Sequence, residues 1–291
     1  MRISIDTPDD FDFLECVNAH GWRSLLPFCW DTEPKVLERI EEFGDGNAAL
    51  LTIRGSNGKL DVDAHGSAPE QDVVRRVKIM FQLDLDIARF YTYCAKQPAL
   101  CHIPQLRQGR ILRSPSLFED AVKVIATTNT TWSRTKGMVA RIVESFGTPL
   151  PGDAARRAFP RPDQIASVTL EEFSEKARLG YRNASVHRIA TDIVEGRLDL
   201  ESWRDSEITS QDLYKRLLSL PGIGPYAASC LMIYLGRYER VNVDSWARMM
   251  VGKELGRSVT DKEAHAFFEP YGEWKALVYH FYRWRESAPE F

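Results

Sequence analysis

Residues 220–228 have the clearest potential for chemistry. They read Leu-Pro-Gly-Ile-Gly-Pro-Tyr-Ala-Ala and lie between an amphipathic run over 211–219 and an apolar run over 230–235. This pattern predicts two helices joined by a tight hairpin. Gly222 and Gly224 stand where the chain must reverse, and glycine accepts a positive φ without steric cost. Unpaired N–H groups and the positive end of the second helix favour an anion such as phosphate.

A carboxylate follows this hairpin at a defined distance. Asp244 stands 18 residues after Tyr226, between Val-Asn-Val and a helical pattern. This is an ordinary N-cap position, and a helix N-terminus also favours the ionised form of a carboxylate. An ionised carboxylate can stabilise positive charge that develops beside it, and it can orient or deprotonate a water molecule.

The hairpin together with Asp244 resembles the helix-hairpin-helix (HhH-GPD) family of DNA glycosylases, in which a Gly-Pro-rich hairpin precedes a catalytic aspartate. The hairpin is similar to that of bacterial 3-methyladenine DNA glycosylases. Asn129 with Arg134, and Leu-Gly-Tyr-Arg at 179–182, resemble 8-oxoguanine DNA glycosylases, and the likeness covers residues 75–285. The resemblance implies that Asp244 supports the cationic sugar as an N-glycosidic bond breaks in double-stranded DNA containing a damaged base.

The resemblance also assigns roles to individual residues. The predicted site consists of the catalytic Asp244, the base-pocket residues Tyr226, Cys230 and Trp246, and the DNA-binding residues Gly222, Gly224, Asn129, Arg134, Tyr181 and Arg182. Among the latter, Asn129 and Tyr181 would fill the gap left by a flipped nucleotide, and the two arginines would bind its former partner. The alternative is a set of solvated loop arginines with a packing tyrosine, and core positions for Cys230 and the aromatic side chains.

Tyr226 bears on the type of reaction. It occupies the place where bifunctional relatives carry a lysine that forms a Schiff base with the sugar. A phenol cannot form a Schiff base. The sequence therefore predicts a monofunctional enzyme that hydrolyses the glycosidic bond and leaves the abasic strand intact.

The choice of damaged base depends on the pocket. Leu25 stands in place of a glycine whose carbonyl reads an oxidised base in the family, and Ala276 in place of a base-reading glutamine. A cationic alkylpurine needs mainly aromatic faces, which Tyr226 with Trp246 or Trp30 could supply. We therefore expect alkylated purines such as 3-methyladenine or 7-methylguanine as substrates. The alternatives are an 8-oxoguanine-type glycosylase without lyase activity and a non-catalytic helix-hairpin-helix module that only binds DNA.

Composition sets the remaining expectations. The chain has 291 residues, of which 44% are hydrophobic and 27% charged, as in an ordinary globular protein. Its five cysteines show no Cys-x-x-Cys spacing, and none follows Cys230, so neither a disulfide framework, a zinc site nor the iron–sulfur cluster of some relatives is expected. No organic cofactor is expected, and a monovalent cation at the hairpin is left open.

Charge and hydropathy indicate where the protein works. The formal net charge is −3, but residues 111–190 carry 12 Lys and Arg against 8 Asp and Glu, so a basic face is expected there. The N-terminus has no apolar signal region, and no run approaches the length of a membrane span. We expect a cytoplasmic monomer, nucleoid-associated if bacterial, with no membrane partner.

The elements that must position these residues divide the chain in two. Residues 1–80 predict a small α+β subdomain, with a hairpin of strands around Gly-Ser-Asn-Gly at 55–58. Residues 81–291 predict a two-lobed helical domain, so the class is mainly α. Its last helices carry an apolar face made of Trp274, Leu277, Val278, Phe281 and Trp284.

Overall fold

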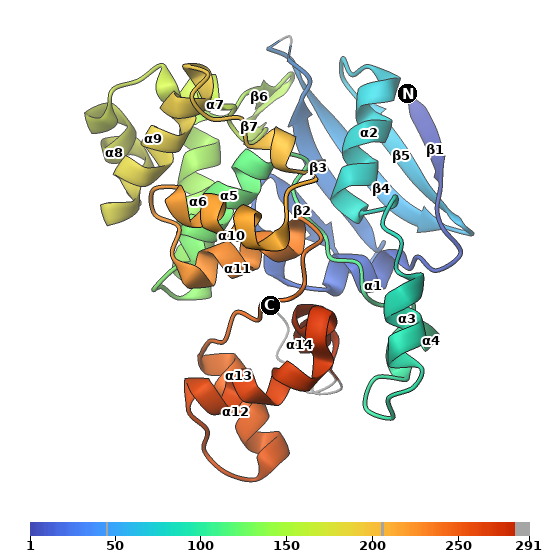
Figure 1. The fold of residues 1–291 in the computed structure, drawn as a ribbon. Coiled ribbons are helices and arrows are strands. Elements are labelled where there is room, and N and C mark those ends of the chain that lie inside the picture. Colours follow the sequence, from blue (N-terminus) through green and yellow to red (C-terminus); the bar gives the residue numbers. More distant parts are fainter. Residues whose placement is uncertain (45, 205–206, 283–291) are drawn as a thin grey trace.

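The computed structural model describes residues 1–44, 46–204 and 207–282. An N-terminal antiparallel sheet is followed by helices that build the rest of the molecule, with α12 to α14 forming a separate lobe below the others (Figure 1). The fold is therefore mainly helical with an N-terminal α+β part, which confirms the predicted class. Trp284, predicted on the last apolar face, lies outside the described residues.

Five strands form the N-terminal sheet in the order β1-β5-β4-β3-β2, and every neighbouring pair is antiparallel. The strands are β1 (Arg2–Asp6), β2 (Phe28–Asp31), β3 (Val36–Glu42), β4 (Ala48–Ser56) and β5 (Lys59–His65). Ser56 pairs with Lys59 across a two-residue turn in which Gly58 has φ of 70°, so the predicted hairpin is confirmed. The other three strands were not predicted.

Seven helices precede residue 150 in the described part of the chain. They are α1 (Phe13–Asn18), η1 (Gly21–Ser24), α2 (Glu70–Phe81), α3 (Ala88–Cys94), α4 (His102–Gln105), α5 (Leu117–Thr127) and α6 (Trp132–Phe146). A short hairpin of β6 (Pro149–Leu150) and β7 (Asp153–Arg157) follows. Helix α2 lies across one face of the sheet (Figure 1).

Helices after residue 160 carry the predicted hairpin and the C-terminal lobe. They are α7 (Pro162–Ala166), α8 (Leu170–Ala177), η2 (Gly180–Arg182), α9 (Asn183–Val194), η3 (Glu201–Trp203), α10 (Ser210–Ser219), α11 (Pro225–Tyr234), α12 (Ser245–Leu255), α13 (Asp261–Phe268), η4 (Glu269–Trp274) and α14 (Lys275–Phe281). Among the described residues, no helix is long and apolar enough to cross a bilayer.

Helix α5 is the element against which both halves pack. Its residues from Leu117 to Ala126 are all buried, and Ser116 caps it by accepting a hydrogen bond from the Glu119 N–H at 3.2 Å. Glu119 also binds the sheet, since Arg39 of β3 donates to its two carboxylate oxygens at 3.0 and 2.6 Å. Lys123 pairs with Glu119 at 2.7 Å. A buried ion cluster therefore fixes the sheet to the helices.

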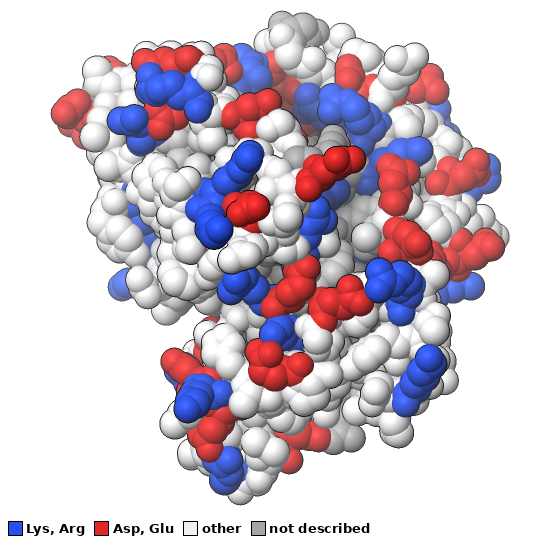
Figure 2. All heavy atoms as spheres, in the orientation of Figure 1, with Lys and Arg blue, Asp and Glu red and all other residues white. Residues whose placement is uncertain are grey.

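The surface carries both signs of charge. On the face drawn in Figure 2, lysine and arginine side chains are interspersed with aspartates and glutamates. Surface ion pairs within one element include Arg188 with Asp192 at 2.7 Å on α9 and Lys215 with Asp212 at 3.2 Å on α10. Paired charges of this kind keep a surface hydrated and contribute little net attraction for a partner.

Candidate active site

The predicted hairpin lies between α10 and α11. Gly222 has φ of 80°, and a Cβ atom there would lie 2.8 Å from the side chain of Ser185, so this position requires glycine. Gly224 also stands at the reversal, as the N-cap of α11, but it has φ of −94° and open space around it, so a positive φ is found only at Gly222. Pro225 begins α11, where its missing N–H costs nothing. Both glycines are exposed, so the start of α11 faces solvent.

Asp244 caps α12. Its Oδ1 accepts a hydrogen bond from the backbone N–H of Ala247 at 2.8 Å, and the Tyr279 hydroxyl donates to the same oxygen at 3.5 Å. The described residues place no donor on Oδ2. The cap and a chemical role are therefore compatible, because each can use its own oxygen.

Asp244 lines a cavity of about 280 Å³, a size at the lower end of ligand pockets. The cavity lies between η1, α5, the start of α6, α11, the loop before α12, and α14. The residues that line it are His20, Gly21, Trp22, Val124, Thr127, Thr130, Trp132, Thr135, Tyr226, Cys230, Ile233, Tyr234, Asn242, Asp244, Trp246, Tyr279 and His280. Indole, phenol and imidazole rings predominate, so the cavity suits a flat aromatic ligand.

The polar side chains of the cavity gather beside Asp244. Asn242 Nδ2 donates to Cys230 Sγ at 3.3 Å. Burial raises the pKa of the Cys230 thiol to about 12. The neighbouring Cys230, burial and the Asp244 carboxylate raise the pKa of the Tyr226 hydroxyl well above its ordinary range. Phenol and thiol therefore both stay neutral at physiological pH and act as hydrogen-bonding groups, whereas a nucleophile would need a depressed pKa.

Known proteins resemble the chain in sequence and in fold. No protein-family model matches the chain. It is 24% identical to a probable N-glycosylase/DNA lyase of Methanothermobacter thermautotrophicus, over 94% of this chain and 91% of that protein. The chain is similar to this protein over almost its whole length, and its hairpin and Asp244 are those expected of the helix-hairpin-helix DNA glycosylases.

Two solved structures have the same fold. One is the Clostridium acetobutylicum 8-oxoguanine glycosylase/lyase in complex with double-stranded DNA containing cytosine opposite 8-oxoguanine, with a TM-score of 0.74 and 20% identity over 99% of this chain and 98% of that one. The other is a 3-methyladenine DNA glycosylase from Archaeoglobus fulgidus, with a TM-score of 0.74 and 17% identity over 98% of each chain. The fold alone therefore does not distinguish oxidised from alkylated bases.

The three predicted base-pocket residues all line the cavity. They are Tyr226, Cys230 and Trp246. The prediction of which N-terminal residues form the cavity wall was wrong. Leu25 and Ala276 are fully buried and do not line the cavity, and Trp30 packs on Phe13 with ring centroids 6.0 Å apart. Residues 20–22 of η1 and its N-cap form that wall instead, because the chain reaches the cavity four residues earlier than the resemblance indicated.

The cavity also contains residues that sequence analysis missed. Asn242 was passed over although it lies two residues before Asp244 in an extended segment, a spacing that turns both side chains to one side. Tyr279 and Trp22 gave no sequence signal, because an aromatic residue at helical spacing is usually core. Their place in the cavity depends on long-range packing alone.

The predicted DNA-contacting residues divide into two kinds. Asn129 Nδ2 lies 3.5 Å from the Tyr181 hydroxyl, and Tyr181 is 68% exposed, so these two side chains form one projection beyond the end of α5. Arg134 is exposed at the start of α6. Arg182 is buried and donates to the carbonyl groups of Ile125, Leu179 and Thr128. In the free protein its guanidinium is thus occupied by backbone.

The described part of the chain offers no ready metal centre. No three His, Cys, Asp or Glu side chains among the described residues gather closely enough to hold a metal ion. The cysteines are dispersed, with Cys16 and Cys94 buried, Cys29 and Cys101 exposed and Cys230 in the cavity. A monovalent cation at the hairpin stays a prediction.

Proposed function

We propose that this chain is a monofunctional DNA N-glycosylase of base excision repair that releases 8-oxoguanine from double-stranded DNA. One observation carries the proposal. Asp244 and Tyr226 face a single aromatic-lined cavity beside an exposed helix-hairpin-helix turn, and no lysine is among the described residues that line this cavity. A carboxylate without an amine suits hydrolysis and does not suit Schiff-base chemistry.

The chemistry follows from the free oxygen of Asp244. A damaged nucleotide leaves the duplex stack and its base enters the cavity. As the bond between C1′ and the base nitrogen lengthens, its electron pair leaves with the base and positive charge grows on the sugar. Asp244 Oδ2 stabilises that charge and accepts a proton from the water whose oxygen bonds to C1′. The departing base nitrogen takes up a proton equivalent to the one that Asp244 has accepted, so the products are the neutral free base and an intact abasic strand.

The hairpin and the paired side chains of Asn129 and Tyr181 supply the binding surface. The N–H groups at the start of α11 suit a phosphate, and they carry no information about sequence. Tyr181, exposed and supported by Asn129, suits the gap that a flipped nucleotide leaves. A module that only binds DNA has no use for a carboxylate beside a phosphate-binding turn, where it adds repulsion.

The preference for an oxidised purine rests on the relatives and on the corrected pocket. The solved Clostridium relative is an 8-oxoguanine glycosylase/lyase. The expectation of an alkylated base relied on Leu25 and Ala276 replacing base-reading residues, and neither side chain lines the cavity. Leu25 and Ala276 therefore give no argument against 8-oxoguanine as the substrate.

Alkylated purines are the second candidate. Trp22, Trp132 and Trp246 all line the cavity, and indole faces attract a positively charged ring such as that of 7-methylguanine. The similar fold of the Archaeoglobus 3-methyladenine DNA glycosylase agrees with this possibility. The two candidates share Asp244 and Tyr226 and differ only in how the base is selected.

A panel of duplexes tests the proposal. Otherwise identical duplexes containing 8-oxoguanine, 7-methylguanine, 3-methyladenine or guanine opposite cytosine or thymine are incubated with enzyme and cleaved at abasic sites with alkali. We expect fastest release of 8-oxoguanine, no strand cleavage before alkali, and no adduct after borohydride. Preferential release of the methylpurines would support the second candidate. A trapped adduct would contradict the monofunctional assignment, and no release from any duplex would leave a DNA-binding module.

A further inference from the structure

The buried carboxylate of Asp120 is hydrogen-bonded to Trp22, which forms the N-terminal wall of the cavity. Trp22 Nε1 donates to Asp120 Oδ1 at 3.0 Å, although 98 residues separate the two. Asp120 has no exposed surface, accepts the Ser114 N–H at 2.9 Å and lies 3.5 Å from Arg204 Nη2. Burial raises the pKa of Asp120, and the Arg204 guanidinium and the Trp22 N–H oppose that shift. The carboxylate thus joins η1 to the first turn of α5.

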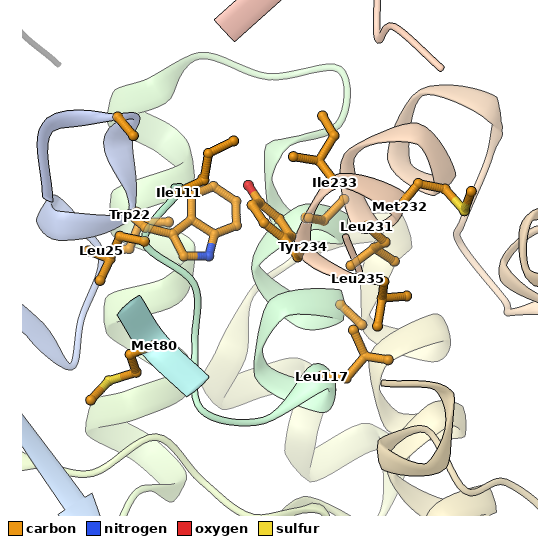
Figure 3. Packing of buried hydrophobic residues seen from close by; sticks show 14 of the residues in the cluster. Trp22, Leu25, Met80, Ile111, Leu117, Leu231, Met232, Ile233, Tyr234 and Leu235 are labelled. Carbon is orange, nitrogen blue, oxygen red and sulfur yellow. The ribbon is translucent and has the colours of Figure 1, made fainter. Parts of the chain in front are cut away.

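Aromatic contacts hold the other side of the same indole. The Trp22 ring lies 4.7 Å from the ring of His20 and 5.2 Å from that of Tyr234, measured between centroids. Figure 3 shows Trp22 and Tyr234 pointing toward one another from η1 and α11. Packing against these rings restricts movement of the indole, and the bond to Asp120 adds a directional contact to Nε1, its single polar atom.

The position of this wall sets the width of the cavity. A Cβ atom on Gly21 would lie 2.4 Å from Cζ2 of Trp132, so the η1 backbone is in direct contact with a second indole that lines the cavity. Trp22 is the next residue along η1, so the backbone of one turn connects the two indoles that line this side of the cavity.

We propose that Asp120 is a positioning residue for base selection: it holds the Trp22 indole, and through it the η1 wall, at the spacing that a damaged purine requires. This inference rests on the proposed function. Asp120 touches neither DNA nor base. Its effect reaches the ligand through Trp22, and a charge-assisted bond in a dry interior is strong enough to fix a ring.

A neighbouring acidic residue, Glu201, provides a control. Glu201 binds the same Arg204, with Nε donating to its Oε2 at 3.0 Å, and accepts the Leu117 N–H at the start of α5 at 2.6 Å. It does not line the cavity. Glu201→Gln therefore removes a charge beside the same helix and the same arginine as Asp120→Asn, but leaves the carboxylate that accepts the Trp22 N–H unchanged.

The test measures base recognition apart from DNA binding. In full-length protein carrying Asp244→Asn, so that the base stays attached, Kd is measured for a duplex with 8-oxoguanine opposite cytosine and for the same duplex with a tetrahydrofuran abasic site. We expect Asp120→Asn, whose amide oxygen accepts only a neutral hydrogen bond, and Trp22→Phe, which has no N–H, each to lower the preference for the base by about tenfold, the scale of the difference between a charge-assisted and a neutral hydrogen bond. The double variant should lose no more than either single one, and Glu201→Gln should keep the preference.

The outcomes separate this inference from the proposed function. A preference retained in Asp120→Asn, or additive losses in the double variant, would overturn the positioning role. A parent protein without any preference for 8-oxoguanine would contradict the proposed substrate instead. Hydrogen exchange of the Trp22 indole N–H, measured by NMR without DNA, then decides the inference. Exchange that is faster in Asp120→Asn than in Glu201→Gln supports it, and equal exchange overturns it.

Discussion

Asp244 Oδ1 lies 2.8 Å from the backbone nitrogen of Ala247, so one carboxylate both caps α12 and lines the base cavity. The two roles can be separated because asparagine caps a helix as well as aspartate does, but carries no negative charge. Stability and chemistry should therefore respond differently to the same substitution.

Asp244→Asn should lower the single-turnover rate of base release at least about 100-fold, because the lost charge acts mainly on the transition state. Its melting temperature and its Kd for a lesion-bearing duplex should stay close to those of the wild type. Asp12→Asn is the matched control, since Asp12 caps α1 by accepting the Glu15 N–H at 2.9 Å. Base release by Asp244→Asn at the rate of the Asp12→Asn control would remove Asp244 from the mechanism.

The two hairpin glycines should respond in different ways. Gly222→Ala should destabilise the protein by about 1 to 3 kcal/mol, because a positive φ and the Ser185 side chain both oppose a Cβ. Gly224→Val should leave the melting temperature unchanged, because open space surrounds that position. It should weaken binding to damaged and undamaged duplexes by the same factor, since a bulky group there obstructs a phosphate. A loss confined to the damaged duplex would contradict a phosphate-binding role for the turn.

Thiol reactivity tests the environment of Cys230. Burial raises its pKa to about 12 from an ordinary value near 9, so little thiolate forms at pH 8.5. Iodoacetamide at that pH should modify Cys29 and Cys101, which are exposed, and leave Cys230 intact in the native protein. Peptide mapping by mass spectrometry checks this result, and protein unfolded in urea is the control. Rapid native modification of Cys230 would indicate an open, polar cavity.

The same shift has a consequence for stability. In the unfolded chain the Cys230 thiol ionises near its ordinary pKa, whereas in the folded protein it keeps its proton up to about pH 12. The unfolded state therefore binds fewer protons above pH 9, and this contribution to stability is lost as the pH rises beyond that value. Cys230→Ala should reduce the slope of the free energy of unfolding against pH between pH 9 and 10.

The sequence predicted the parts of the site that local chemistry determines. The hairpin, the Asp244 cap and the Asn-Gly turn at 57–58 each depend on neighbouring residues, and each is confirmed. Strand β3 was missed because Arg39 and Glu41, which read as solvent-facing charges, are buried in ion pairs with each other, with Glu119 of α5 and with Arg76 of α2. A pattern of alternating polarity cannot show such pairing.

The base cavity shows the same limit. Its wall at Trp22 depends on a bond to Asp120 and on packing against Tyr234, both distant in sequence. The resemblance located this wall four residues too late in the sequence, at Leu25, a buried residue that does not line the cavity, whereas Gly21 and Trp22 of η1 do. The family motif thus identified the reacting carboxylate, while the selectivity of the pocket required the tertiary structure.

Arg182 and Arg134, the two arginines assigned to the partner base, should have different effects on stability and on DNA binding when they are replaced. Arg182 donates to the Ile125 carbonyl at 3.1 Å and the Leu179 carbonyl at 3.3 Å, and Arg182→Ala would leave these buried acceptors without partners. We expect a loss of about 3 kcal/mol in the free energy of unfolding, measured by urea denaturation. Arg182→Lys should rescue it only in part, because lysine lacks the planar fork.

Arg134 is exposed, so Arg134→Ala should change stability by less than about 0.5 kcal/mol. Its effect should instead depend on the base opposite the lesion, with the largest loss of affinity for cytosine, whose acceptors suit a guanidinium. Arg182→Ala should weaken every pairing alike, because it loosens the end of α5 that carries Asn129. Fluorescence anisotropy on duplexes that differ only in the opposite base distinguishes the two. Dependence of Arg182→Ala on that base would show that its guanidinium leaves the backbone carbonyls when DNA binds.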